Sequence, residues 1–334
     1  MQWRTLNKPL SLTALLAISV CGSTHADWFK QSQDIMGTRV AVELWSNNPE
    51  LENSCANQVF TEMQRIDALM SPYKSTSEVA NINQHAAQKA VNVSAELISL
   101  IRQSMYFSEK SNGAFDITFA SIGFQYDYRQ HKQPDAETIQ HDLKTINYHN
   151  LIVENNSVQF AMPGMSIDLG GIAKGYAVDK AIKILQQCGI QQALVSAGGD
   201  SRILGDKQGK PWMIGIQHPR KKQAIALTIP LTDTAISTSG DYERYFVSNK
   251  KRIHHIINPA TGRSANQSWS ATVIGPDATT TDALSTTVFI LGAKEGLKLI
   301  NSLDNIDAII IDSQGIVHYS SGLENPENNY GNNP

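Results

Sequence analysis

The chain has 334 residues, which is enough for one large domain or for two closely joined subdomains. Its 28 Lys and Arg residues nearly balance 31 Asp and Glu residues, and the formal net charge is −3. No basic stripe with interleaved aromatic residues is present, so we expect no nucleic acid partner.

Residues 1–26 have the pattern of a secretory signal. A short basic start precedes the apolar segment 10–22, which is too short to span a bilayer as a mature helix. We favour cleavage after Ala26 over lipoprotein processing at Cys21, because Val20 is bulky where a lipoprotein signal has a small residue. Both routes export the protein, so we expect a periplasmic location, with membrane attachment only if the cysteine is lipidated.

The part that follows, residues 27–322, mixes strands and helices. In chain order, the hydrophobic pattern predicts strands within 27–46, helices over 50–70 and 94–111 with a short helix between them, and an irregular stretch over 114–150. It then predicts strands at 151–153 and 158–161, a strand, glycine turn and helix start over 166–179, and strands at 193–197, 212–217, 224–230, 235–238, 244–247, 255–257 and 270–274. A helix over 281–303 and strands at 308–311 and 317–319 complete the pattern. Because these elements do not alternate regularly, we expect an α+β fold of mixed sheets with packed helices. The Asn- and Pro-rich tail, 323–334, is expected to be disordered.

Two cysteines remain beyond the signal, Cys55 and Cys188. Two buried small apolar side chains would account for them. An exported protein also permits a disulfide, but sequence spacing alone does not establish one. No Cys-x-x-Cys pair is present, so we predict neither thiol redox chemistry nor a structural zinc site.

A glycine-rich segment carries the first chemical signal. Residues 168–176 read Asp-Leu-Gly-Gly-Ile-Ala-Lys-Gly-Tyr between a predicted strand and a predicted helix. Glycines at a helix start let backbone N–H groups approach a phosphate. A tight turn without a ligand explains the glycines equally well, because the segment matches neither known phosphate-loop pattern.

The second signal lies at the start of the last long helix. Asp282 and Thr286 are four residues apart, so their oxygens project from the same helix face. Such a set suits a hard cation such as Mg²⁺. Taken alone, the pair is better explained without a metal: the helix dipole favours an acidic side chain near the N-terminus, and the threonine packs within the helix.

Several shorter segments add candidate residues. His254 and His255 precede a turn, and a histidine there is able to act as a general base if it faces a substrate. Phe115, Asp116 and Tyr73 offer aromatic faces and an acceptor for a flat ring, although a buried loop anchor and an exposed turn residue are the simpler explanations. The segments 197–200 (Ala-Gly-Gly-Asp) and 237–244 add a turn, hydroxyls and Arg244.

As an ordered set, these segments resemble the FAD:protein FMN transferases, the ApbE (Ftp) family. The segments that carry the resemblance are 36–38, 69–73, 113–116, 168–176, 197–200, 255–262 and 282–286, and they extend over nearly all of the chain beyond the signal. Asn258 stands where the family often has Asp, and Gly171 where it often has Ala or Thr.

The resemblance implies the following roles. FAD binding is implied for Met36, Tyr73, Ala114, Phe115, Asp116, Asp168, Lys174 and Ile256. Mg²⁺ binding is implied for the carbonyl of Gly171, for Asp282 and Thr286, and for Ser285. His255 matches the histidine that activates the acceptor.

The resemblance also implies the reaction. The family cleaves the pyrophosphate of FAD, attaches FMN through a phosphoester to a Thr or Ser hydroxyl of an acceptor protein, and releases AMP. Its acceptors include membrane subunits of the sodium-pumping NADH:quinone oxidoreductase and related electron-transport proteins. Two alternatives remain from the residues: an FAD pyrophosphatase with water as acceptor, and a periplasmic flavin-binding protein without turnover.

Overall fold

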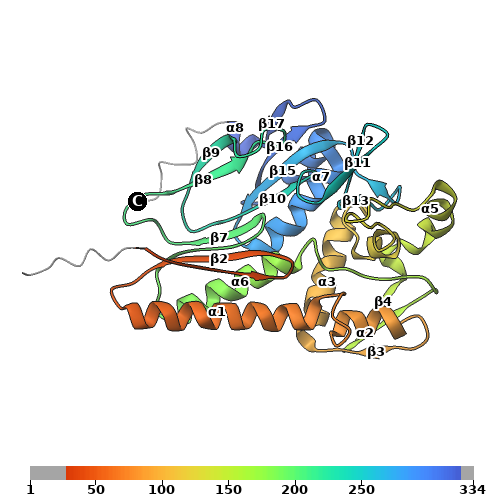
Figure 1. Ribbon diagram of the computed structural model, residues 1–334, viewed down its shortest axis with the longest axis horizontal. Helices are drawn as coiled ribbons and strands as arrows, with labels where there is room; N and C mark the ends of the chain where they lie inside the picture. The colour runs from red at the N-terminus through yellow and green to blue at the C-terminus, as the bar shows by residue number, and fades with distance from the viewer. Residues whose placement is uncertain (1–27, 325–334) are drawn as a thin grey trace, which may run out of the picture.

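The computed structural model describes residues 28–324 (Figure 1). The predicted signal, with Cys21 and both processing sites, lies outside these residues. Residues 323 and 324, expected to start a disordered tail, instead close the helix α8 (Ser321–Glu324). The rest of that predicted tail is outside the described part of the chain.

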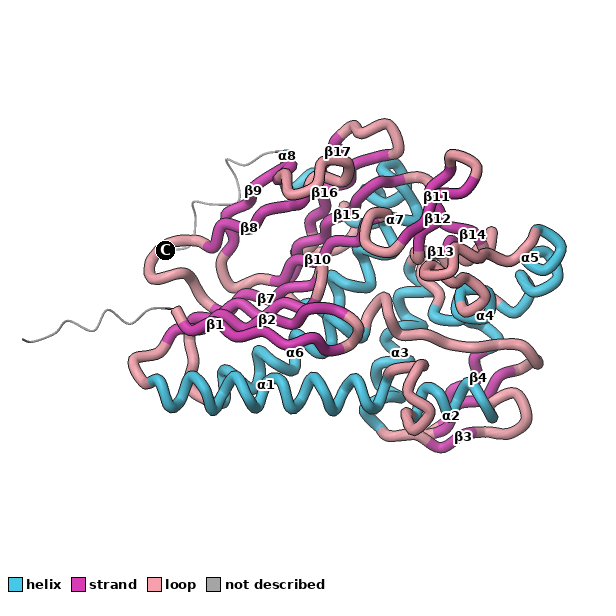
Figure 2. The backbone as a smooth tube through the Cα atoms, viewed as in Figure 1, coloured by secondary structure: helices cyan, strands magenta, loops and turns pink. Residues whose placement is uncertain are grey.

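An antiparallel sheet of eight strands forms the centre of the molecule, in the order β1-β2-β6-β7-β10-β15-β16-β17 (Figure 2). Its strands are β1 (Phe29–Ile35), β2 (Thr38–Trp45), β6 (Gln192–Ala197), β7 (Asp200–Leu204), β10 (Ala235–Gly240), β15 (Ser268–Gly275), β16 (Asp307–Asp312) and β17 (Val317–Tyr319). The smaller sheets are β3 (Val91–Asn92) with β5 (Ser157–Phe160) and β4 (Leu151–Glu154), β8 (Trp212–Gln217) with β9 (Ile225–Leu231), β11 (Tyr245–Ser248) with β12 (Lys251–His254), and β13 (Ile257–Asn258) with β14 (Arg263–Ser264).

The helices lie mainly on one face of the large sheet. They are α1 (Pro49–Met70), α2 (Glu78–His85), α3 (Ala95–Lys110), α4 (Ala120–Gly123), α5 (Ala136–Asp142), α6 (Ala173–Gln187), α7 (Ala278–Ile300) and α8, with short 3₁₀ turns η1 (Ile117–Phe119), η2 (Leu143–Thr145) and η3 (Tyr148–Asn150). α6 packs between α1 and α7, and all three contact the sheet (Figure 1). The expected α+β class is confirmed. None of the helices within residues 28–324 is both long and apolar enough to cross a membrane.

Strand alternation divides the apolar residues between the two faces of the sheet. On β6, Ala193 and Val195 belong to the main core under the helices, whereas Leu194 faces the opposite side. There it joins a smaller cluster with Ile203 and Trp212, through which the β8–β9 hairpin covers the second face. Both faces of the sheet are therefore covered in this region, and the helical face is the one that carries the site described below.

The first long helix shows how the sequence determines these elements locally. Asn48 caps α1 by accepting from the backbone N–H groups of Glu50 and Leu51, with Pro49 in the first turn. One face of the helix is buried, and the helix ends at Met70, with Ser71 as its cap before a proline. The predicted helix over 50–70 is confirmed. The stretch 114–150, expected to be irregular, instead contains α4, α5 and three 3₁₀ turns, because side-chain caps such as Asp135 start short helices there.

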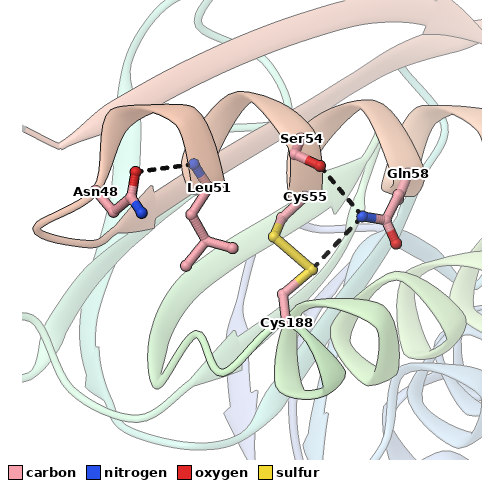
Figure 3. Close-up of a disulfide and its surroundings, with 6 residues drawn as sticks. All are labelled: Asn48, Leu51, Ser54, Cys55, Gln58 and Cys188. Atoms are coloured by element: carbon pink, nitrogen blue, oxygen red, sulfur yellow. Dashed lines mark hydrogen bonds between the residues drawn. A yellow bond between two sulfur atoms is a disulfide. The ribbon is translucent and has the colours of Figure 1, made fainter.

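A disulfide joins Cys55 on α1 to Cys188, the residue that follows α6 (Figure 3). The sequence had left two buried apolar side chains as the alternative. Gln58 lies beside the bond, with its amide nitrogen 3.9 Å from the sulfur of Cys188. The link therefore ties two helices whose cysteines are 133 residues apart in the chain.

Removing this link with the double substitution Cys55→Ser and Cys188→Ser is expected to lower the free energy of unfolding by about 2–4 kcal/mol, because the unfolded chain gains the freedom of a long open loop. Urea titration of the oxidised protein and of the variant measures the difference. The reduced wild-type protein is the matched control and should resemble the variant. Equal midpoints for all three would show that the bond adds no stability.

Candidate active site

Three charged side chains from three distant parts of the chain meet on the helical face of the sheet. Lys174 lies in the first turn of α6, Asp200 is the first residue of β7, and Asp282 lies in the first turns of α7. The ammonium of Lys174 lies 2.5 Å from Oδ2 of Asp200 and 3.3 Å from Oδ1 of Asp282. Both carboxylate side chains are only 3% exposed. The three groups form a buried ionic cluster with two negative charges and one positive charge.

Burial and mutual repulsion govern ionisation in this cluster. Burial first, and the nearby Asp200 second, raise the pKa of Asp282 to about 7, against the opposing effect of Lys174. Burial of the Lys174 ammonium works to lower the pKa of Lys174, but the two carboxylates outweigh it and raise that pKa. Because burial and Asp200 disfavour the ionised form of Asp282, an additional cation beside this carboxylate would stabilise that form.

A glycine lets α6 and α7 approach closely enough to form the cluster. The backbone N–H of Gly175 donates to Oδ2 of Asp282 at 2.9 Å. A Cβ atom at this position would overlap the carbonyl oxygen of Ala278 on α7. Any side chain at residue 175 would therefore separate the two helices and move the carboxylate.

Hydroxyl groups continue the polar surface along α7. Ser237 and Ser239, two residues apart on β10, lie 2.9 Å from Thr281 and Ser285, four residues apart on α7. Two residues of a strand and four residues of a helix advance by nearly the same length, so the pairs remain in register. Ser239 also lies 3.2 Å from the hydroxyl oxygen of Thr286.

The residues predicted to hold Mg²⁺ come together here. A Cβ atom on Gly171 would lie 3.4 Å from Oγ1 of Thr286, which places the glycine turn against α7 beside Asp282 and Ser285. Residues 28–324 contain no group of three His, Cys, Asp or Glu side chains that could hold a metal ion. One buried carboxylate with hydroxyl and carbonyl oxygens still fits Mg²⁺, which commonly takes one or two protein carboxylates and completes its shell with water and phosphate oxygens.

The two neighbouring histidines have different environments. His254 is 2% exposed, and its Nε2 lies 2.7 Å from the carbonyl oxygen of Ala265. His255 follows the end of β12, is only partly buried, and has an Nδ1 atom without a hydrogen-bond partner in the described structure. The strand predicted over 255–257 is therefore wrong at its first two residues, since the chain bends between β12 and β13. Of these two histidines, His255 is therefore the one with a ring nitrogen that has no partner among the described residues.

Burial is the main cause that lowers the pKa of His255, to about 3, and the positive charges of His254, Arg244 and Lys174 act in the same direction. The imidazole is therefore neutral at neutral pH, which is the form that accepts a proton. Its backbone N–H donates to the carbonyl oxygen of Arg244 at 3.1 Å, and this bond holds the residue against the segment 237–244.

The residues predicted to bind FAD divide into two groups. Tyr73 is 77% exposed, packs edge-on against Phe124 and lies within electrostatic range of Asp168 and Arg244. Asp168 opens the glycine segment, in a stretch without a strand although the sequence predicted one there. Its Oδ1 accepts from the N–H of Gly170 at 2.7 Å, and burial raises its pKa. These groups border the cluster from the side of the exposed surface.

The second group is buried in the protein itself. Asp116 accepts from Thr118 and from the backbone N–H of Tyr148, so its carboxylate orders its own loop. This agrees with the simpler explanation of the segment, a buried loop anchor. Phe115 is 3% exposed and lies against the Gly171 turn. Three further predicted residues are buried or pack against the cores, namely Met36, Ala114 and Ile256.

Comparison with known proteins decides the family. The model of the ApbE family matches residues 36–310. The chain belongs to the ApbE family. This confirms the predicted resemblance, and the match includes every segment that carried it.

Relatives of this ApbE chain span nearly its whole length. A protein from Treponema pallidum is 30% identical, covering 92% of this chain and 91% of the relative, and one from Klebsiella pneumoniae is 31% identical, covering 88% and 92%. Both are named FAD:protein FMN transferase. The solved ApbE protein from Thermotoga maritima has a TM-score of 0.82 at 36% identity, covering 89% of this chain and 98% of that one. The flavin transferase ApbE from Vibrio cholerae has a TM-score of 0.80 at 26% identity, covering 90% and 99%.

The ApbE site also contains residues to which sequence reasoning gave no role. Asp200 was interpreted only as part of a turn, although it is the closest partner of Lys174. Asp179 lies on α6, three residues after the glycine segment, and its carboxylate accepts from the N–H groups of Ala278 and Thr279 at 2.9 and 2.8 Å. It thereby caps α7 from another helix and positions the helix that carries Asp282. A carboxylate after a glycine-rich helix start was the available signal, but its partner lies 99 residues away.

Asp179→Ala is expected to lower the free energy of unfolding by about 1–3 kcal/mol, because two backbone donors at the start of α7 lose their acceptor. Asp277→Ala is the matched control: it removes the local cap of the same helix, which accepts only from Thr280, and should cost about 1 kcal/mol. Denaturant titration measures both. A smaller loss for Asp179→Ala than for the control would contradict the role given to Asp179.

Proposed function

We propose that this protein is a Mg²⁺-dependent FAD:protein FMN transferase that acts in the periplasm. It cleaves the pyrophosphate of FAD, attaches FMN through a phosphoester to a Thr or Ser hydroxyl of an acceptor protein, and releases AMP. The observation that carries the proposal is the convergence of Asp282, Thr286 and the Gly171 turn at one place in a chain of this family. The names of its relatives support the same reaction.

The position of each residue suggests its role in the reaction. Asp282 and Thr286, with the carbonyl of Gly171 and the neighbouring Ser285, would hold Mg²⁺. Bound there, the ion would neutralise charge on the pyrophosphate and make AMP a better leaving group. The exposed ring of Tyr73 borders the site and would help to keep water from the reacting phosphate.

His255 would take the proton from the acceptor hydroxyl. The residue is partly exposed, its ring is neutral, and its buried Nδ1 has no hydrogen-bond partner among the described residues. Lys174 was predicted to grip FAD, but its ammonium is engaged by two carboxylates. Its contribution is therefore to the charge of the cluster, and we retain Tyr73 and Asp168 as the residues that face the flavin nucleotide.

A membrane subunit of a sodium-pumping NADH:quinone oxidoreductase, or of a related electron-transport complex, is the acceptor class that we propose. The signal-like residues 1–26 support an acceptor site outside the cytoplasm. If Cys21 is lipidated, the enzyme would be attached to the same membrane.

Incubating the purified protein with FAD, Mg²⁺ and a soluble acceptor domain, followed by mass spectrometry, tests the proposal. A mass gain of one FMN on a Thr or Ser, together with released AMP, is expected. AMP and free FMN with several acceptor domains left unmodified would favour the pyrophosphatase instead. Bound FAD without any AMP would identify a flavin-binding protein.

A further inference from the structure

Asp200 is held more rigidly than a surface turn requires. It starts β7, pairs with Ala197 in β6 and Ser237 in β10, and is 2% exposed. The preceding turn is fixed as well: Gly198 has a φ of 64°, and a Cβ atom on Gly199 would lie 2.5 Å from the carbonyl oxygen of Thr238. The carboxylate of Asp200 therefore has a fixed position at the edge of the buried cluster.

The ammonium of Lys174 is not shared equally between its two partners. It lies 2.5 Å from one oxygen of Asp200 but 3.3 and 3.4 Å from the two oxygens of Asp282. Oδ2 of Asp282 has a second donor, the N–H of Gly175. Lys174 therefore bonds to both carboxylates, with a short hydrogen bond to Asp200 and two long ones to Asp282.

The charges explain why this asymmetry matters. Two carboxylates and one ammonium leave the cluster with one net negative charge. If Lys174 lay as close to Asp282 as it now lies to Asp200, its charge would largely cancel that of the Asp282 carboxylate, which would then attract a divalent cation less strongly.

We propose that Asp200 is a positioning residue that holds the Lys174 ammonium beside Asp282 and so keeps the Asp282 carboxylate available for a divalent cation. This inference rests on the metal site of the proposed function. Asp200, the last residue of the segment 197–200, would thus act on the cation site by positioning Lys174, without contacting the ion itself.

Substitutions that change one charge at a time test the proposal. Asp200→Asn removes the charge that holds Lys174 on the Asp200 side, so the ammonium should move closer to Asp282 and the dissociation constant for the cation should rise more than tenfold. Adding Lys174→Met to Asp200→Asn restores one net negative charge and removes the competing ammonium, so binding should return to within about threefold of the wild type. Asp200→Glu keeps the charge but shifts the ammonium, and should weaken binding more than threefold.

The readout is Mn²⁺ binding to the protein, measured from the electron paramagnetic resonance signal of the free ion. If the double variant binds as weakly as Asp200→Asn, Asp200 is itself a ligand and the proposal is wrong. If Asp200→Glu binds like the wild type, net charge is sufficient and position has no role, which also overturns it. Melting temperatures of all variants identify any that fail to fold, and the folded ones decide the result.

Two further variants separate this inference from the proposed function. Asp282→Ala should abolish Mn²⁺ binding; if it does not, the metal assignment fails independently of Asp200. Asp304→Ala is the matched control, because that side chain is exposed beyond the end of α7, and it should bind Mn²⁺ like the wild type.

Discussion

Replacing Asp282 with alanine is expected to reduce the release of AMP from FAD by at least about 10³-fold at ordinary Mg²⁺ concentrations. A bound metal supplies several kcal/mol of charge stabilisation in phosphoryl transfer, and each 1.36 kcal/mol corresponds to a factor of ten in rate. The variant should still fold, because Lys174 keeps its hydrogen bond to Asp200. Chromatographic measurement of AMP over a range of Mg²⁺ concentrations gives the result.

The Mg²⁺ dependence of this variant is as informative as its rate. Asp304→Ala is again the matched control and should turn over like the wild type. Partial recovery of Asp282→Ala at high Mg²⁺ would agree with weakened metal binding. A normal rate at ordinary Mg²⁺ would exclude Asp282 as a metal ligand.

Replacing His255 with alanine is expected to slow FMN transfer by about 10²–10⁴-fold, the usual contribution of a general base. FAD binding should be unchanged, because the ring donates no hydrogen bond that the described structure records. His254→Ala gives the contrast: it removes the buried ring that contacts the Ala265 carbonyl, and it should lower the melting temperature. Loss of FAD binding in the His255 variant would make His255 a binding residue.

The pH dependence follows from the pKa of His255, which is lowered to about 3. The ring stays neutral from pH 8 down to about pH 5, so its ionisation should produce no fall in the transfer rate near pH 6.5, the value for a free histidine. The stability of the fold, unlike the transfer rate, should depend on pH through this residue. Between pH 6.5 and about 3 the unfolded chain takes up a proton at this residue and the folded chain does not, so the free energy of unfolding should fall as the pH falls through that range.

Local signals in the sequence were sufficient to predict many of the helices and strands. The helix over 50–70 was predicted because an apolar face and a terminating proline are both signals within a few residues, and the structure adds the Asn48 cap at its start. The shared direction of Asp282 and Thr286 was predictable for the same reason, since helical geometry alone places residues i and i+4 on one face. The bend at His255 was missed because strand alternation gives no sign of where a short strand ends.

By itself, the sequence determined the family, the α+β class and the segments that carry the chemistry, because these depend on residue order and on local periodicity. Only the tertiary structure decided which of those residues meet. The partners of Lys174 lie 26 and 108 residues away, and the donors to Asp179 lie about 100 residues away. The tertiary structure also showed that Cys55 pairs with Cys188 and that Asp116 forms hydrogen bonds within its own loop. Contacts across such separations depend on how strands and helices pack, and packing is a property of the whole core rather than of any one segment.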